Sequence, residues 1–425
     1  MTELTAASLV ERMTPEEQAR AERVESVLPA LREHARAVDA EGRFEPSHVR
    51  TLSEAGLLGL IVPEAYGGLG GSLRDLAGAT FAMGTACPST ALAYFFHCSS
   101  ASRGLLALEA LDAGLFNDEE APVVRAFAEK VLYTMGRDGQ WLANFASESV
   151  KSEKAAITIS TEAVPTEGGF LVSGVKSFGC ATGVADRYLV TAKLKDEPSA
   201  AGLCTFFIDR DGDGVKERER WDAIGMRGTA THGLSLEDVF VAAEDALAVP
   251  GAFVRCMQMS RGSFVGNQLA GTAVYAGAAK AIYDNTVKLL TERKFADTGR
   301  PLGTSPLHQE ILGKMMVDLE TAMLWLRRQL ELETAEPPLL DKQRVVQQWR
   351  LCKGVVAESG YQVAMGAFKA GGTSGTTNTG PNARSIRDMA MGLVQAFPAE
   401  RGRQMAAQME IEGNEQAQFT TGGKS

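Results

Sequence analysis

The sequence has few cysteines and histidines, and it groups neither kind of residue as a metal site would. The six cysteines, at positions 87, 98, 180, 204, 256 and 352, include no C-x-x-C pair, and the five histidines include no H-E-x-x-H motif. Scattered cysteines of this kind are typical of reduced thiols in a cytosolic protein. We therefore expect no disulfide framework, no metal centre and a cytoplasmic location.

The chain also lacks excess positive charge and long apolar runs. Its 53 Asp and Glu against 43 Lys and Arg give a formal net charge of −10, which argues against nucleic acid or an anionic membrane as a partner. No stretch approaches the roughly 18 apolar residues of a membrane span. The first residues, MTELTAASLVERMTPEEQ, do not have the basic and then apolar regions of a signal peptide.

Phosphate-loop and nucleophile motifs are missing as well. The sequence contains no G-x-x-x-x-G-K-[ST], no G-x-S-x-G and no strand-linked G-x-G-x-x-G. The glycine-rich stretch YGGLGG at 66–71 has neither a βαβ context nor a following lysine, so it predicts a turn. No motif therefore supports a P-loop nucleotide site, a nucleophile-elbow hydrolase or a Rossmann dinucleotide site.

What the sequence does contain is a change of pattern along its length. At 425 residues the chain exceeds the usual size of a single core, so two or three packed units are expected. Thr14, Pro15 and Glu17 form a helix start with a capping box. Four further helices are predicted in the first 140 residues, over 48–55, 73–83, 89–108 and 122–133.

The middle of the chain has short segments rich in β-branched and aromatic residues, which predict strands. Most of these segments have no helix-length segment between them, so an antiparallel or mixed sheet is expected. The predicted strands are 155–161, 168–174, 187–194, 203–210 and 234–241. Long helical patterns return at 253–293, 306–333, 341–369 and 381–411, and the tail that starts GNEQAQ is predicted to fray.

The predicted fold class is α+β, with an N-terminal α-helical domain over 1–140, a middle β-sheet or barrel domain over 141–247 and a C-terminal four-helix bundle over 248–425. In this order of elements, four segments resemble the acyl-CoA dehydrogenase superfamily of FAD enzymes. They are GLLGLIVPEAYGGLGGSLRD with CPSTALAYFFH, VSGVKSFGCATGVADRYLVTAKL, IGMRGTATHGLSLEDVFV and GGTSGTTNTGPNARSIRD. The resemblance covers nearly the whole chain, and it implies an FAD cofactor and a homodimer or homotetramer.

The resemblance also implies which residues face the flavin ring. Phe178 stands where the family usually has a tryptophan beside the ring, and Cys180 stands where a threonine hydroxyl usually approaches N5. Phe145 and Ser147 match the strand that lines the flavin and donates a hydroxyl. A flavin needs an aromatic or apolar face and hydrogen-bond partners that tune its electronics. The alternative for Phe145 and Phe178 is core packing, and a thiol at Cys180 is a weaker donor than a hydroxyl.

Two later segments match cofactor-binding regions of the family. The first, 293–309, matches the region that holds the ADP half of FAD, and the second, which begins GGTSG, matches the loop whose paired glycines bring the backbone close to FAD. They contribute Arg293, Phe295, His308, Gln309, Gly371 and Gly372. Anionic phosphates favour cations and backbone N–H groups, and glycines let the backbone come close to a cofactor. In the family the first of these regions meets the flavin of a neighbouring subunit. For Arg293 the alternative is a solvated charge at a helix end.

The carboxylate base of the family has no counterpart here. Aligned back from Arg387 and Asp388, the expected base position is Thr379, and the second position used in the family falls at about Asn267. Neither side chain can take up an α-proton as a carboxylate does. The sequence also reads SESVKSEK (147–154) and AFP (396–398) where the family usually has other motifs. The catalytic residues therefore stay unassigned.

Three functions remain open. The first is an FAD oxidoreductase acting on CH–CH donors in an acyl-CoA or acyl-carrier-protein thioester, with an atypical base and an electron-transfer flavoprotein as acceptor. The second is a flavin monooxygenase that uses oxygen; its relatives carry a histidine where this chain has Gln395, although His97 is a further candidate. The third is a catalytically silent subunit of a hetero-oligomer.

Overall fold

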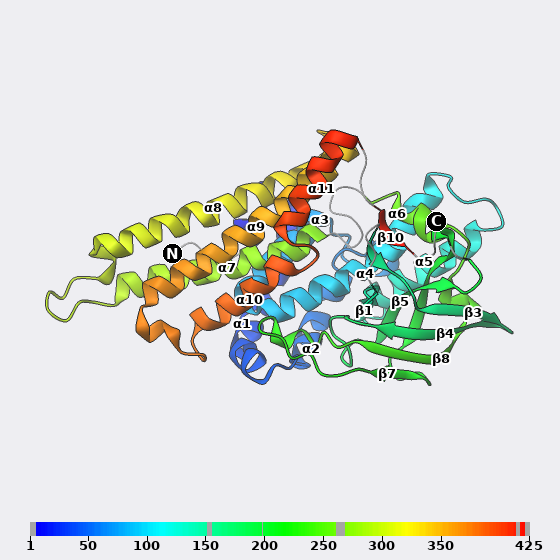
Figure 1. Ribbon diagram of the computed structural model, residues 1–425, viewed down its shortest axis with the longest axis horizontal. Coiled ribbons are helices and arrows are strands. Elements are labelled where there is room, and N and C mark those ends of the chain that lie inside the picture. Colours follow the sequence, from blue (N-terminus) through cyan, green and yellow to red (C-terminus); the bar gives the residue numbers. More distant parts are fainter. Residues whose placement is uncertain (1–5, 151–154, 198, 261–267, 414–416, 421–425) are drawn as a thin grey trace.

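The computed structural model describes residues 6–150, 155–197, 199–260, 268–413 and 417–420. A bundle of long helices forms one end of the molecule and a β domain the other, with helix α4 running between them (Figure 1). The predicted α+β architecture, with helices before and after a β region, is confirmed. In the described residues, no helix combines the length and the apolar character needed to cross a bilayer.

The N-terminal region consists of five α-helices, and the predicted helix start at Thr14 is confirmed with its capping box. Their bounds are α1 Pro15–Glu41, α2 Ser47–Glu54, α3 Leu73–Ala86, α4 Pro88–Asp112 and α5 Ala121–Gly136. Most residues of α3 and α4 are buried around the whole circumference of the helix. Arg103, in the buried part of α4, is therefore surrounded by protein instead of water.

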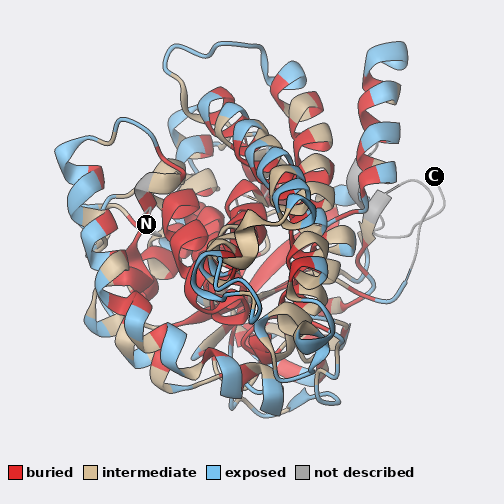
Figure 2. Ribbon diagram, turned by 90° about the vertical axis from the view of Figure 1, so that its left-hand side faces the viewer, coloured by how far each residue is buried: buried red, intermediate tan, exposed pale blue. Residues whose placement is uncertain are grey.

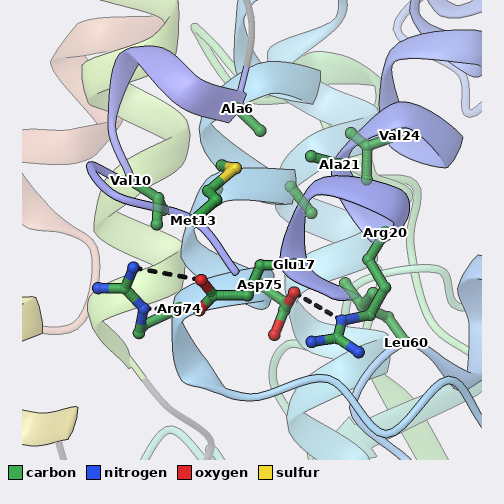
Figure 3. Close-up of a pocket in the computed structure, with 12 residues that line it drawn as sticks. Ala6, Val10, Met13, Glu17, Arg20, Ala21, Val24, Leu60, Arg74 and Asp75 are labelled. Carbon is green, nitrogen blue, oxygen red and sulfur yellow. Dashed lines mark hydrogen bonds and ion pairs between the residues drawn. The ribbon is translucent and has the colours of Figure 1, made fainter. Parts of the chain in front are cut away.

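Helices α1 and α3 are joined where both begin. Glu17 and Asp75 are the third residues of their helices and close the two capping boxes, and each also pairs with an arginine of the other helix. Arg74 Nε lies 2.6 Å from Glu17 Oε1, and Arg20 Nε lies 2.7 Å from Asp75 Oδ1 (Figure 3). The hollow beside these pairs measures about 10 Å³, room for one water at most. It is a structural joint and no ligand site.

The β domain is a mixed sheet in the order β7-β8-β4-β3-β5-β6-β9, and β1 pairs with β5 outside this order. Strand β5 pairs in parallel with β1 and β3 and antiparallel with β6, so the expected mixed sheet is confirmed. The strands are β1 Leu142–Phe145, β2 Ala155–Thr158, β3 Glu162–Thr166, β4 Gly169–Lys176, β5 Arg187–Leu194, β6 Leu203–Asp209, β7 Val215–Glu217, β8 Leu234–Ala242 and β9 Ala246–Leu247.

The C-terminal region is helical and packs against the N-terminal helices through α3. Gly84 of α3 and Gly277 of α7 let the two backbones touch, because an added Cβ would lie 2.4 Å from Val274 O and 2.0 Å from Phe81 O, respectively. Figure 2 shows buried residues concentrated in the interior of the molecule and exposed residues on its outer helices. The helices are α6 Ala252–Met257, α7 Gln268–Glu292, α8 Pro306–Thr334, α9 Lys342–Gly371, α10 Pro381–Val394 and α11 Ala399–Glu412.

Three predictions about this region are wrong. The pattern at 381–411 is not one helix, because it is interrupted between Val394 and Ala399, next to Pro398, and a residue before proline is disfavoured in helical conformation. The tail does not simply fray, because β10 (Ala417–Thr420) pairs in parallel with β2. Similarly, the pattern at 253–293 contains two described helices, α6 and α7.

Candidate functional site

A cavity of about 580 Å³ lies where the β domain meets both helical regions. Helix α4 supplies one wall, with Leu92, Phe96, Ser99 and Arg103. The loops after β1 and β4 and the loop before β8 supply a second, and α7, α9 and the break after α10 supply the rest. These further lining residues include Ser147, Glu148, Phe178, Cys180, Trp221, Met226, Thr229, Thr231, Tyr275, Trp349, Arg350, Gln395, Ala396 and Phe397. The cavity is large enough for part of a cofactor and a small molecule.

The loops around this cavity hold most of the strained backbone. Six non-glycine residues among those described have a left-handed φ. Four of them are in these loops: Ala181 (φ 61°), Met226 (48°), Ala230 (45°) and Ala396 (61°). Such conformations cost free energy and persist where the surrounding structure holds them, most often at functional sites. The clustering independently favours this cavity as the functional site.

Phe178 presents an open aromatic face to the cavity. Its side chain is 52% exposed, and it meets Trp221 edge-on at 5.7 Å between ring centroids, so the face of the ring remains open to a planar partner. Phe145, which was also expected to face the flavin, is instead fully buried behind this wall. An added Cβ on Gly179 would lie 2.1 Å from the Phe145 ring, so Phe145 supports the loop that carries Phe178.

Cys180 begins a chain of hydrogen bonds that leads away from the cavity. Its Sγ lies 3.1 Å from Thr231 Oγ1, and Thr231 Oγ1 lies 2.6 Å from Thr229 Oγ1. Because the Thr229 hydroxyl donates to Met226 O at 2.9 Å, Thr231 donates to Thr229 and the thiol donates to Thr231. Burial raises the pKa of the Cys180 thiol to about 12. The thiol is therefore protonated, and its hydrogen is not available to a group in the cavity.

Glu148 is the carboxylate on the described cavity wall, and it is fully engaged. Lys176 Nζ donates to its Oε1 at 2.6 Å, and both side chains are buried. The amides and hydroxyls of Ser160 and Thr161 donate to its two oxygens. Burial favours a higher pKa for Glu148, but Lys176 and these hydroxyls outweigh it, so the pKa lies below its usual value.

Two arginines on the cavity wall were missed by sequence reasoning. Arg103 of α4 and Arg350 of α9 are 4% and 3% exposed, and burial lowers the pKa of each to about 10, so both remain cations. Arg350 lies 5.5 Å over the Phe397 ring. Helix α4 could have provided a hint, because Arg103 follows the small residues CSSAS in a helix with little polar surface. Its place in a cavity could not be read from the sequence.

The structure brings together only part of the predicted site. Ser147, Phe178 and Cys180 line the cavity. Arg293 and Phe295 lie at the α7–α8 turn, with His308 and Gln309 at the start of α8, and Gly371 and Gly372 close α9. Both segments are at the end of the bundle away from the β domain (Figure 1). Within one chain these six residues do not join the cavity.

The candidate catalytic positions do not supply a base either. Thr379 is exposed in the loop before α10 and does not line the cavity, whereas Ala396 does. Asn267 lies outside the described residues. His97 is a buried structural residue, because its Nδ1 accepts from Leu142 N at 2.9 Å and its Nε2 contacts Leu58 O at 2.8 Å. Burial lowers its pKa to about 4. The prediction that His97 is a site residue is therefore wrong.

Comparisons with known proteins give a consistent family. The chain matches the models of the acyl-CoA dehydrogenase N-terminal domain over 14–108, the middle domain over 144–239 and the C-terminal domain over 269–397. It is 26% identical over 374 residues to a putative acyl-CoA dehydrogenase of Bacillus subtilis, which covers 88% of this chain and 91% of that protein.

A second relative is named for a different function, and a solved structure of the same fold contains a flavin. The pigment production hydroxylase of a Rhodococcus species is 24% identical over 385 residues, covering 88% of this chain and 92% of the relative. The solved structure of KijD3 with FMN and a dTDP-linked amino sugar has a TM-score of 0.78 at 22% identity, covering 97% of this chain and 98% of that one.

Proposed function

The chain belongs to the acyl-CoA dehydrogenase family, and from that premise we propose that it is a flavin-dependent monooxygenase acting on a small molecule in the cavity beside Phe178. The observation that carries the proposal is the state of the cavity carboxylate. Glu148 is the acidic residue among the described residues of the cavity wall, and its hydrogen-bonding capacity is used by Lys176, Ser160 and Thr161.

Desaturation of a thioester needs a base for the α-proton, and a suitable base has a pKa near the working pH. The pKa of Glu148 is displaced in the opposite direction, below its usual value. Removing Glu148 from Lys176 would also leave a buried cation uncompensated. Oxygen insertion does not depend on a carboxylate that removes an α-proton, so the cavity suits the monooxygenase better than the thioester dehydrogenase.

The residues of the cavity fit a flavin. Phe178 offers its open ring face, and Trp221 fixes the orientation of that ring from the side. The family uses FAD, and KijD3, which shares the fold, was solved with FMN. When bound, a reduced flavin supplies two electrons with which one atom of molecular oxygen enters the substrate and the other becomes water.

The chain itself contributes position, protection from water and a fixed set of donors. Phe96, Leu92 and Trp349 are apolar residues of the cavity wall, and apolar walls limit the water around the reacting centre. The Tyr275 hydroxyl donates to the Gln395 side chain, so the amide group of Gln395 is held at the cavity wall. The thiol of Cys180 presents sulfur lone pairs to the cavity, since its hydrogen points to Thr231.

We further infer that the working protein is a homo-oligomer. Six of the ten residues expected to bind the cofactor, Arg293 and its partners at the bundle end, are remote from the cavity of their own chain (Figure 1). A neighbouring copy that presents this end to the cavity would bring aromatic, cationic and glycine groups to the ADP half of the cofactor.

The test uses the flavin-loaded full chain, whose mass in solution is measured first by light scattering. With a flavin reductase, NADH and isotopically labelled molecular oxygen, we expect an oxygen-dependent product that carries one labelled oxygen atom. In anaerobic solution, a panel of acyl-CoAs should leave the oxidised flavin spectrum unchanged.

Bleaching of the flavin by an acyl-CoA without oxygen would contradict the proposal and favour the dehydrogenase. A flavin-loaded protein that shows neither reaction across a broad substrate panel would favour a silent subunit.

A further inference from the structure

Arg103 is a buried cation at the cavity wall that has very few partners. The residue is 4% exposed and lines the cavity from α4. Its Nη2 donates to Thr191 Oγ1 at 3.3 Å, whereas Nε and Nη1 have no hydrogen-bond partner. The guanidinium also lies 4.9 Å over the ring of Phe253. An arginine has five N–H donors, so most of the donors of Arg103 are unused.

No described carboxylate compensates this charge. Glu148, the acidic residue of the described cavity wall, is paired with Lys176, and the ionisable group that influences Arg103 most is the thiol of Cys256. Burying an unpaired charge costs several kcal/mol unless an opposite charge or hydrogen-bond acceptors compensate it. A second cavity arginine, Arg350, adds to the positive potential of the same space. The cavity therefore favours an anion.

The geometry of the free donors indicates the type of anion. Nη2 carries two hydrogens, one on the edge shared with Nε and one on the edge shared with Nη1. Thr191 accepts only one of these hydrogens. Whichever hydrogen that is, the other edge keeps two parallel N–H donors, which is the arrangement that binds a carboxylate with two hydrogen bonds. Nε and Nη1 have almost no accessible surface, so the Arg103 side chain has to turn toward the cavity for a carboxylate to reach this edge. A single negative charge also matches a single unpaired guanidinium.

We propose that the cavity takes a substrate bearing a carboxylate, and that Arg103 binds this carboxylate through the unused edge of its guanidinium. The inference rests on the proposed function for the chemistry that follows, but binding can be tested without turnover. It assigns the substrate class as small organic acids whose apolar part lies against Phe96, Leu92 and Trp349. Arg103 is thus the specificity-determining residue.

The experiment measures binding to the flavin-loaded protein by calorimetry with matched pairs that differ only in charge. The pairs are benzoate and benzamide, phenylacetate and phenylacetamide, indole-3-acetate and indole-3-acetamide, and hexanoate and hexanamide. At least one acid should bind roughly tenfold or more tightly than its amide, since hydrogen bonds to a charged group are worth that factor or more. Arg103→Met should abolish this preference, and Arg103→Lys, which keeps the charge but loses the two-donor edge, should keep part of it.

Two controls make the result specific. Arg344→Gln removes an exposed arginine that pairs with Glu410 and should leave the preference unchanged. The melting temperature of unliganded Arg103→Met should not fall, because the substitution removes an uncompensated charge; a clear fall together with an unchanged acid preference would show a purely structural arginine and overturn the proposal. Arg103→Lys serves the same comparison if the methionine variant does not fold.

Other outcomes are equally decisive. An acid preference that persists in both Arg103 variants, or no preference for any acid in the parent protein, would overturn the inference. If inorganic phosphate binds in a way that depends on Arg103 and the acids do not bind, the ligand group is a phosphate and the carboxylate proposal is overturned. If the acid preference depends on Arg103 but the oxygenation test fails, only the proposed function falls.

Discussion

Two buried cations, Lys176 and Arg103, both contact Thr191, but they differ in how many hydrogen-bond partners they have. Lys176 Nζ donates to the Thr191 carbonyl at 2.5 Å, to Glu148 at 2.6 Å and to the Ala146 carbonyl at 3.4 Å. Arg103 reaches the hydroxyl of the same threonine, and its Nε and Nη1 have no partner. One cation has all three of its donors satisfied and a carboxylate beside it, whereas the other has neither.

This difference separates a structural ion pair from a ligand-binding group. Lys176 and Glu148 join β4 to the loop after β1 and keep the cavity wall closed. Their charges cancel inside the protein, so nothing needs to be added from outside. Arg103 is held in place by Thr191 and Phe253, but its charge is left for a group that the chain does not provide.

The largest expected effect is that of Lys176→Met. The substitution leaves Glu148 buried without its cation, and breaking a buried pair in this way typically costs about 3–5 kcal/mol. Urea unfolding at neutral pH should therefore show a loss of this size, whereas Arg103→Met, which also removes a buried cation, should show none. A similar loss of unfolding free energy in Lys176→Met and Arg103→Met would mean that Arg103, like Lys176, is compensated by other groups of the chain.

The double variant Glu148→Leu with Lys176→Met is the matched control. Replacing both partners by apolar residues removes both buried charges, so most of the stability lost in the single variant should return. If the double variant is as unstable as Lys176→Met, the loss comes from packing at position 176 and not from the unpaired carboxylate.

The second prediction concerns the pH dependence of this loss. In the parent protein the folded pKa of Glu148 lies below its usual 4.5, so its contribution to stability is present above pH 4.5 and disappears as the pH falls through the folded pKa. In Lys176→Met, burial without the cation should raise the pKa above that value. In the variant, the contribution of Glu148 to the free energy of unfolding is then fully present below pH 4.5 and is lost as the pH rises through the raised pKa.

The difference in unfolding free energy between the two proteins should accordingly narrow on acidification from pH 7 toward pH 4, by about 1.4 kcal/mol for each unit by which the Glu148 pKa in the folded variant exceeds 4.5. Urea titrations at several pH values measure this directly. A gap that stays constant over this range would show that Glu148 is not the group whose ionisation causes the loss.

Much of the fold could be predicted from the sequence because its elements differ locally. The run 187–194 is short, contains β-branched and aromatic residues, lies between turn residues, and is strand β5 over the same residues. Thr14 with Glu17 marks the start of α1. The errors occurred where neighbours decide the outcome. Strand β10 exists only through its pairing with β2, and the break after Val394 places Ala396 in a left-handed conformation at the cavity.

The site was predictable only where the family resemblance supplied positions. Phe178 and Cys180 were found at the cavity for that reason. Arg103 and Glu148 were not, because their roles depend on which charges lack or have a partner in three dimensions. A lysine at 176 follows ordinary strand residues in the sequence, and nothing local indicates that it is completely buried. Charge compensation is a long-range property that spacing along the chain does not report.

The smallest effect is expected from Thr191→Val, which separates the two cations at the residue they share. Lys176 uses the backbone carbonyl of residue 191, and this acceptor remains in valine. Arg103 loses its hydrogen bond to the hydroxyl, and a hydrogen bond from a charged donor is worth about 1.5–3 kcal/mol. Urea unfolding should therefore show a loss within that range, and its pH dependence should match the parent, since the Glu148 pair is intact.

The guanidinium of Arg103 should be less well oriented in Thr191→Val. The preference for an acid over its amide should therefore decrease without disappearing, because the charge remains. A loss comparable to that of Lys176→Met would show that the threonine hydroxyl supports the ion pair as well, and that the two cations form one network instead of two independent sites.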